Sequence, residues 1–115
     1  MSFMDLRQND LDGEIPPRLG HCKRLIVIDL DDNKLSGTIP PYFGILEGLQ
    51  MLVLYNNFAE GHLPRDLIHF KNLTNVSLLN NKLNGSIIPL CGSSFLKTLD
   101  LTNNSFFTGN PVPIG

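Results

Sequence analysis

Apolar and polar residues alternate in five short stretches of this chain, and the stretches recur at nearly constant spacing. Within each stretch the apolar side chains stand two residues apart, which is the period of a β-strand with one buried face. The alternation predicts that ten side chains point inward: Met4 and Leu6, Ile28 and Leu30, Leu52 and Leu54, Val76 and Leu78, and Leu99 and Leu101. The pattern therefore predicts five short parallel strands, stacked about 4.8 Å apart.

An asparagine follows each stretch, at intervals of 24, 24, 24 and 23 residues: Asn9, Asn33, Asn57, Asn81 and Asn104. A side-chain amide can satisfy backbone groups, so we expect these residues to form a structural asparagine ladder that bonds each turn and the next coil. A glycine that permits a tight bend comes next, at Gly13, Gly37, Gly61, Gly85 and Gly109. Ile-Pro or Leu-Pro follows in the first three repeats and predicts an extended flank.

These slots make up the motif LxxLxLxxNxLxGxIPxxLxxLxx, which is the leucine-rich repeat in its plant form. The expected fold is an α/β leucine-rich-repeat solenoid of 24-residue repeats. Its parallel β-sheet lies on the concave face, and its convex side is irregular or 3₁₀. We expect about four and a half repeats over residues 1–104, an irregular tail over 105–115, and no terminal caps. Ala59 occupies a slot that otherwise holds leucine.

Composition limits the possible functions. The net charge of −2 over 115 residues offers no basic surface for nucleic acid. The apolar runs are far too short to insert into a membrane, and the first ten residues do not resemble a signal peptide. We find no paired nucleophile and base, so we expect neither enzymatic activity nor a cofactor.

The sequence resembles the ectodomains of plant leucine-rich-repeat receptor kinases, in particular the GASSHO receptor kinases. The resemblance is carried by DLRQNDLDGEIPPRLGHC, LVLYNN, LPRDLIHFKNLT and LNGSIIPLCGSS. It implies a plasma-membrane receptor serine/threonine kinase whose extracellular repeats bind secreted, tyrosine-sulfated peptides. The chain lacks the glycine-rich loop, His-Arg-Asp and Asp-Phe-Gly motifs of the kinase itself.

Candidate ligand-binding residues lie at solvent-facing slots of the concave strands: Asp29, Asp31, Met51, Val53, Tyr55, Ser77 and Leu79. Their apolar members predict an exposed patch with an acidic border, which is the form of a peptide-binding surface. The alternative is ordinary solvent-facing sheet, on which scattered apolar side chains are normal. A sulfate pocket needs cations, yet this face offers only Arg7, with Lys97 at its edge. We therefore place the sulfate site of such a receptor outside this segment.

Metal sites are not expected. The run Asp29, Asp31, Asp32 resembles a calcium loop but lacks its glycine and its glutamate at position twelve. The histidines share no phase in the repeat, so they predict neither zinc binding nor a catalytic triad: His21, His62 and His69.

Two cysteines, Cys22 and Cys91, lie three repeats apart. That offset is about 14 Å at the spacing of parallel strands, so we expect two free thiols and no disulfide. Four N-x-S/T sequons suggest an exported glycoprotein: Asn72, Asn75, Asn84 and Asn103.

The first function expected from these observations is a ligand-recognition segment of a plant receptor-kinase ectodomain, outside the plasma membrane. Its partner is a secreted peptide or protein bound on the concave sheet, and a co-receptor is a further candidate partner. One alternative is a secreted protein like the plant leucine-rich-repeat inhibitors of polygalacturonases. The other alternative is a truncated gene product without independent activity.

Overall fold

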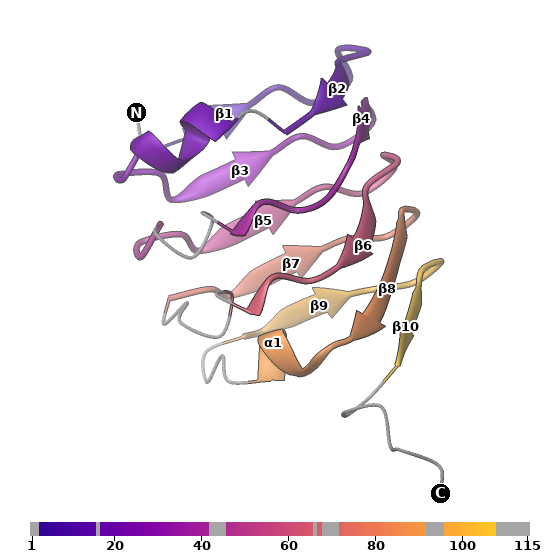
Figure 1. The fold of residues 1–115 in the computed structure, drawn as a ribbon. Helices are drawn as coiled ribbons and strands as arrows, with labels where there is room; N and C mark the ends of the chain where they lie inside the picture. Colours follow the sequence, from indigo (N-terminus) through magenta and orange to yellow (C-terminus); the bar gives the residue numbers. More distant parts are fainter. Residues whose placement is uncertain are drawn as a thin grey trace, which may run out of the picture.

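The computed structural model describes residues 3–15, 17–41, 46–65, 67, 72–91 and 96–107. The chain winds into stacked coils that follow one another from the first described residues at one end of the stack to the last at the other (Figure 1). Its principal extents are 48 × 28 × 23 Å. Within the described ranges, no helix has the length and apolar character needed to cross a bilayer.

Each coil contributes one short strand to a five-stranded parallel sheet in the order β1-β3-β5-β7-β9 (Figure 1). The strands are β1 (Phe3–Asp5), β3 (Val27–Asp29), β5 (Met51–Val53), β7 (Asn75–Ser77) and β9 (Thr98–Asp100). The register advances by 24 residues in the first three pairings and by 23 in the last, where Asn75 faces Thr98. These spacings confirm the predicted leucine-rich-repeat solenoid. The solvent side of this sheet is called the concave face below.

A second set of strands runs along the neighbouring edge of the stack: β2 (Asp12–Glu14), β4 (Lys34–Ser36), β6 (Glu60–His62), β8 (Lys82–Ser86) and β10 (Ser105–Phe107). They form two separate parallel sheets, β2-β4 and β6-β8-β10, and the break falls next to Ala59. The expectation of an irregular tail from residue 105 is wrong for 105–107, because the backbone of β10 pairs with β8. Residues 108–115 lie outside the described residues.

Two short helices, in the part of the chain that the structure describes, lie on the side away from the concave face. The 3₁₀ helix η1 covers Pro17–His21, and the α-helix α1 covers Ile88–Cys91. Both lie in the return segments, which are too short for longer helices.

The core is a column of apolar side chains between the sheets and the return segments. It contains leucines from every coil, and Ala59 is also buried, at 2% exposure. Of the ten predicted inward residues, Leu6 and Leu99 are exposed, at 41% and 42%, and Met4 and Leu101, in the same two coils, are only partly buried. All four lie in the outermost coils, and β1 and β9 each pair with only one strand, so a neighbouring coil covers them on one side only.

The asparagine after each strand ties its coil to the preceding one. Asn57 Nδ2 donates to the carbonyls of Leu54 in its own turn and Leu30 in the preceding coil, both at 3.0 Å. Its Oδ1 accepts the backbone N–H of Leu35, also in the preceding coil, at 3.0 Å. The predicted direction, toward the next coil, is therefore wrong. The side-chain amide of Asn57 bonds to the preceding coil because the Leu30 carbonyl and the Leu35 N–H of that coil lie beside it.

A second polar ladder occupies the slot just before those asparagines. Asn103 donates to Asn80 at 2.5 Å, and Asn80 donates to Asn56 at 2.7 Å. Asn56 donates to Asp32 at 2.6 Å, and Gln8 donates to the other carboxylate oxygen of Asp32 at 3.4 Å. All five residues have positive φ, between 54° and 59°, a conformation that asparagine and aspartate tolerate best among non-glycine residues. Asp32 terminates the chain of amides because a carboxylate only accepts.

Candidate functional site

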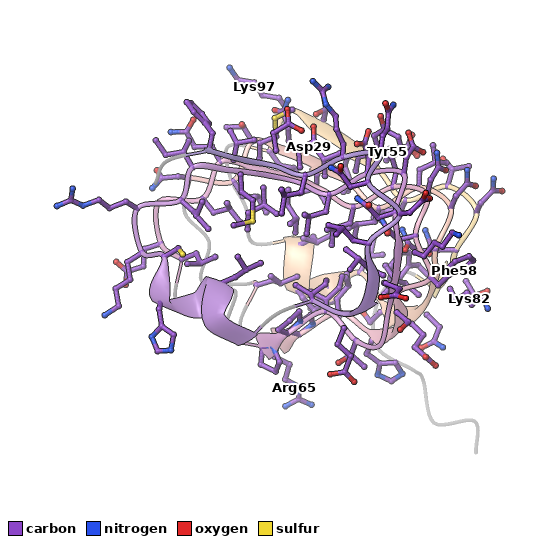
Figure 2. The ribbon with its side chains drawn as sticks, turned by 90° about the horizontal axis from the view of Figure 1, so that it is seen from above. Asp29, Tyr55, Phe58, Arg65, Lys82 and Lys97 are labelled. Atoms are coloured by element: carbon purple, nitrogen blue, oxygen red, sulfur yellow. The ribbon has the colours of Figure 1, made fainter. Side chains whose placement is uncertain are left out.

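The concave face presents three columns of solvent-facing side chains. Each column consists of the residues at one equivalent position of successive coils, and it runs across the strands. In the view down the stack, Asp29, Tyr55 and Lys97 lie along this face and Arg65 lies on the opposite side (Figure 2). Register places Asp29 beside Val53, and Val53 beside Ser77. Neighbours in a column are therefore neighbours in space, as the sequence predicts.

A groove of about 230 Å³ lies on this face. Its lining comes from three adjacent strands and combines apolar with small polar side chains: Met51 and Val53 of β5, Asn75, Val76 and Ser77 of β7, and Thr98, Leu99 and Asp100 of β9. The groove is the concavity that the predicted peptide-binding surface requires. It is centred one strand further along the stack than the sequence predicts.

The seven candidate ligand-binding residues divide into two groups. Asp29, Met51, Tyr55, Ser77 and Leu79 are each partly exposed. Val53 and Asp31 are buried, at 7% and 2% exposure, so the expectation that they lie open on the surface is wrong.

Neighbouring side chains on the same face explain the burial of Val53. Met51 and Tyr55 flank it along the chain, and Asp29 and Ser77 face it across the strands. A short β-branched side chain among these residues contributes little surface of its own.

Tyr55 and Asp31 interact beside the groove. The Asp31 carboxylate accepts a hydrogen bond from the Tyr55 hydroxyl, and this bond together with burial raises the pKa of Tyr55 to about 12. Burial also raises the pKa of Asp29, whose carboxylate accepts the backbone N–H of Asp31 at 3.3 Å. This part of the concave face therefore favours neutral side chains or added positive charge.

At the other end of the face, Asp100 is held ionised by local donors. The backbone N–H of Thr102 donates to Asp100 Oδ1 at 3.0 Å, and the Thr102 hydroxyl donates to the same oxygen. These two bonds lower the pKa of Asp100. A carboxylate at the end of the groove is thus available to a polar or cationic group.

Known proteins are similar to this chain in sequence and fold. The family described as Leucine Rich Repeat matches residues 24–46 and 95–115. The chain is similar to the ectodomain of the plant membrane receptor kinase GASSHO1/SCHENGEN3 from Arabidopsis thaliana, solved in complex with CASPARIAN STRIP INTEGRITY FACTOR 2. The two are 52% identical over 92% of this chain and 13% of that chain, with a TM-score of 0.90. The chain belongs to the leucine-rich-repeat family of plant receptor-kinase ectodomains.

Two further solved structures are similar over most of this chain. PEPR1, solved with AtPEP1, is 38% identical over 92% of this chain and 15% of its own, with a TM-score of 0.89. The plant peptide hormone receptor RGFR1, solved with RGF2, is 36% identical over 92% of this chain and 17% of its own, with a TM-score of 0.89. The chain thus spans less than a fifth of the length of these relatives and carries no kinase domain. Comparison with curated protein sequences gives no significant match.

The remaining candidate residues of this leucine-rich-repeat array are spread around the coils. Asn72, Asn84 and Asn103 are exposed, whereas Asn75 is half-buried and lines the groove. Glycosylation at these sequons stays a prediction.

Thiols and metal ligands are equally scattered. Cys22 is a free, partly buried thiol packed against the core, and the side chain of Cys91 lies outside the described part. Within the described ranges, no group of three or more His, Cys, Asp or Glu residues is arranged to hold a metal ion. His69 lies outside the described residues.

Sequence reasoning missed five groove residues: Asn75, Val76, Thr98, Leu99 and Asp100. Asn75 and Thr98 belong to the same column as Met51, so extending that column would have found them. Leu99 is assigned inward by the strand period, and only the structure shows that it lines the groove.

Proposed function

We propose that this chain is a ligand-recognition segment of a plant receptor-kinase ectodomain, and that it binds a secreted peptide across its concave face. The observation that carries the proposal is the groove over β5, β7 and β9. Its lining combines apolar side chains such as Met51 and Leu99 with polar ones such as Ser77 and Asp100, and this combination suits the side chains of an extended peptide.

The sheet itself limits how a peptide can bind. The backbone groups of the central strands already pair with neighbouring strands, for example Leu54 N–H with the Ser77 carbonyl at 2.9 Å. Recognition therefore depends on side chains that project from the concave face, and the peptide crosses the strands instead of extending the sheet.

The relatives support the class of ligand. The RGFR1 structure is that of a plant peptide hormone receptor in complex with RGF2, and the GASSHO1/SCHENGEN3 ectodomain was solved with CASPARIAN STRIP INTEGRITY FACTOR 2. We extend to this chain the location outside the plasma membrane and the peptide class of ligand. We also extend to it a co-receptor as a second partner and glycosylation at exposed sequons.

Selection from a random peptide library displayed on phage tests this proposal. We expect the 115-residue chain to enrich related peptides, and we expect Ser77→Tyr to abolish their binding, because a tyrosine at this half-buried position fills the groove. Glu60→Tyr on β6 is the matched control, since it adds the same side chain at an exposed position away from the concave face. Enrichment of no peptide, or equal binding by the Ser77→Tyr variant, would contradict the proposal.

A further inference from the structure

The Asp31 carboxylate accepts a hydrogen bond from Tyr55, but its Oδ1 oxygen is buried without a partner among the described residues. The side chain of Asp31 is 2% exposed. Leaving a buried charged acceptor unsatisfied is costly, and such groups are rare unless a ligand or a function uses them.

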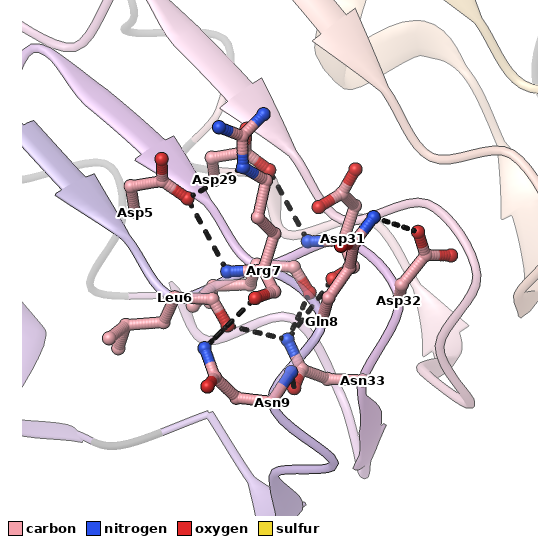
Figure 3. A network of polar contacts seen from close by, with 10 residues as sticks. Asp5, Leu6, Arg7, Gln8, Asn9, Asp29, Asp31, Asp32 and Asn33 are labelled. Carbon is pink, nitrogen blue, oxygen red and sulfur yellow. Dashed lines mark hydrogen bonds and ion pairs between the residues drawn. The ribbon is translucent and has the colours of Figure 1, made fainter.

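Two further carboxylates point to the same side of the sheet. Asp5 and Asp29 project beside Asp31 from β1 and β3, with the Arg7 side chain between them (Figure 3). Arg7 Nε pairs with Asp5 Oδ1 at 3.1 Å, but both side chains are more than half exposed, so this ion pair is weak. Three carboxylates against one guanidinium leave two uncompensated negative charges here.

Tyr55 supplies an aromatic side chain next to these carboxylates. It follows Asp31 in the same column, and the backbone N–H of Asp32 donates to the Tyr55 carbonyl at 3.0 Å. Carboxylates beside an aromatic ring form the environment in which guanidinium and ammonium groups bind, through charge-assisted hydrogen bonds and cation–π attraction.

We propose that Asp29, Asp31 and Tyr55 form a subsite for a basic side chain of the bound peptide. The subsite rests on the proposed peptide-binding function and specifies the chemistry of one ligand residue. A peptide that crosses the strands places this basic side chain over β3 and its apolar side chains in the groove over β5 to β9. An organic cation fits better than a metal ion, because no metal-binding arrangement exists among the described residues.

The subsite also has a consequence for sulfated peptides. A sulfate repels the carboxylates of Asp29 and Asp31, so this end of the concave face selects against an anionic residue. The segment therefore discriminates between ligand residues by the sign of their charge.

Titration with N-acetyl-argininamide, followed by two-dimensional NMR of the full 115-residue chain, tests the subsite. We expect saturable shifts of the backbone amides near Asp29, Asp31 and Tyr55, and no such shifts with N-acetyl-norleucinamide. Asp31→Asn and Asp29→Asn each preserve side-chain shape and should weaken the affinity about tenfold, in line with loss of a charge-assisted bond. Asp12→Asn, at an exposed carboxylate on β2, should leave the affinity unchanged.

Equal shifts with both probes, or unchanged affinity in both folded Asp→Asn variants, would overturn the subsite. Its failure can be told apart from failure of the proposed function. Library peptides that bind the groove but contain no basic residue would remove the subsite and leave peptide binding intact. Binding of argininamide without any library peptide would support the subsite and contradict the proposed function.

Discussion

At the scale of single residues, positive φ angles explain why particular residue types occupy two slots of the repeat that the hydrophobic period does not specify. The slot before each buried asparagine has φ between 54° and 59°, and the glycine slot has φ between 79° and 83°. Polar residues at the first slot link neighbouring coils through their side chains. Glycine at the second slot also lets the preceding coil approach closely: a Cβ at Gly85 would lie 2.8 Å from His62 Cδ2.

Gly85→Ala should therefore destabilise the chain. The new methyl group must be accommodated at φ +83° and against the His62 ring, and we expect a loss of about 1–2 kcal/mol in the free energy of unfolding. Urea denaturation followed by circular dichroism measures it. Gly48→Ala is the control, because φ there is not in the positive range and the nearest atom, the Leu25 carbonyl oxygen, is 4.0 Å away. A loss in Gly85→Ala no greater than in Gly48→Ala would contradict this explanation.

Tyr55 should ionise with a midpoint of about pH 12, because the Asp31 carboxylate and burial favour the neutral hydroxyl. The tyrosine of an unfolded chain ionises at about pH 10. Between these values the unfolded chain has lost a proton that the folded chain keeps, so stability falls as pH rises from 10 to 12. Absorbance titration in a Tyr42→Phe background reports Tyr55 alone. Asp31→Asn should move the midpoint toward 10; a midpoint near 10 in both proteins would show that the two groups do not interact.

At the scale of elements, the stack is held together by side-chain amides as well as by strand pairing. Asn57 satisfies the carbonyls of Leu30 and Leu54 and the N–H of Leu35 in a buried position. The side-chain amide of Asn9 donates to the Leu6 and Arg7 carbonyls of its own turn, at an exposed end of the array. The two asparagines share a slot and differ in how many coils they join.

Asn57→Ala should cost about 2–3 kcal/mol, because it leaves backbone groups buried without partners. Asn9→Ala, where water can replace the lost bonds, should cost less than about 1 kcal/mol. The urea denaturation midpoints of the two variants, measured under the same conditions, compare the two losses of stability. Similar losses for both would mean that the buried amide contributes no more than its exposed counterpart.

The strands and their register follow from the sequence because both depend on a residue pattern that recurs in every coil. The alternation of apolar residues and the regular return of Asn33, Asn57 and Asn81 specify them without knowledge of tertiary contacts. Burial on the concave face does not follow in this way. Val53 and Asp31 are covered by neighbours from other coils and along the strand, so their exposure depends on the sizes of those neighbours.

At the scale of the whole molecule, the concave face is divided into two regions of different chemistry. The first coils present carboxylates that one guanidinium balances only in part, and the later coils present the groove. The stack orders these regions along one axis, so an extended peptide meets them in sequence. Because each coil packs only on its neighbours, the two regions can be altered separately by substitution.

If the groove is the binding site, a ligand crosses β5, β7 and β9. Intermolecular nuclear Overhauser effects between a selected library peptide and the methyl groups and aromatic rings of the chain locate the bound ligand. We expect cross-peaks to Met51, which is partly exposed, and to Leu99, which is 42% exposed; both line the groove. We expect none to the ring of Phe58, which is 47% exposed at the edge of the stack, where Lys82 packs over it. Cross-peaks to Phe58 without any to the groove methyls would place the ligand elsewhere and contradict binding in the groove.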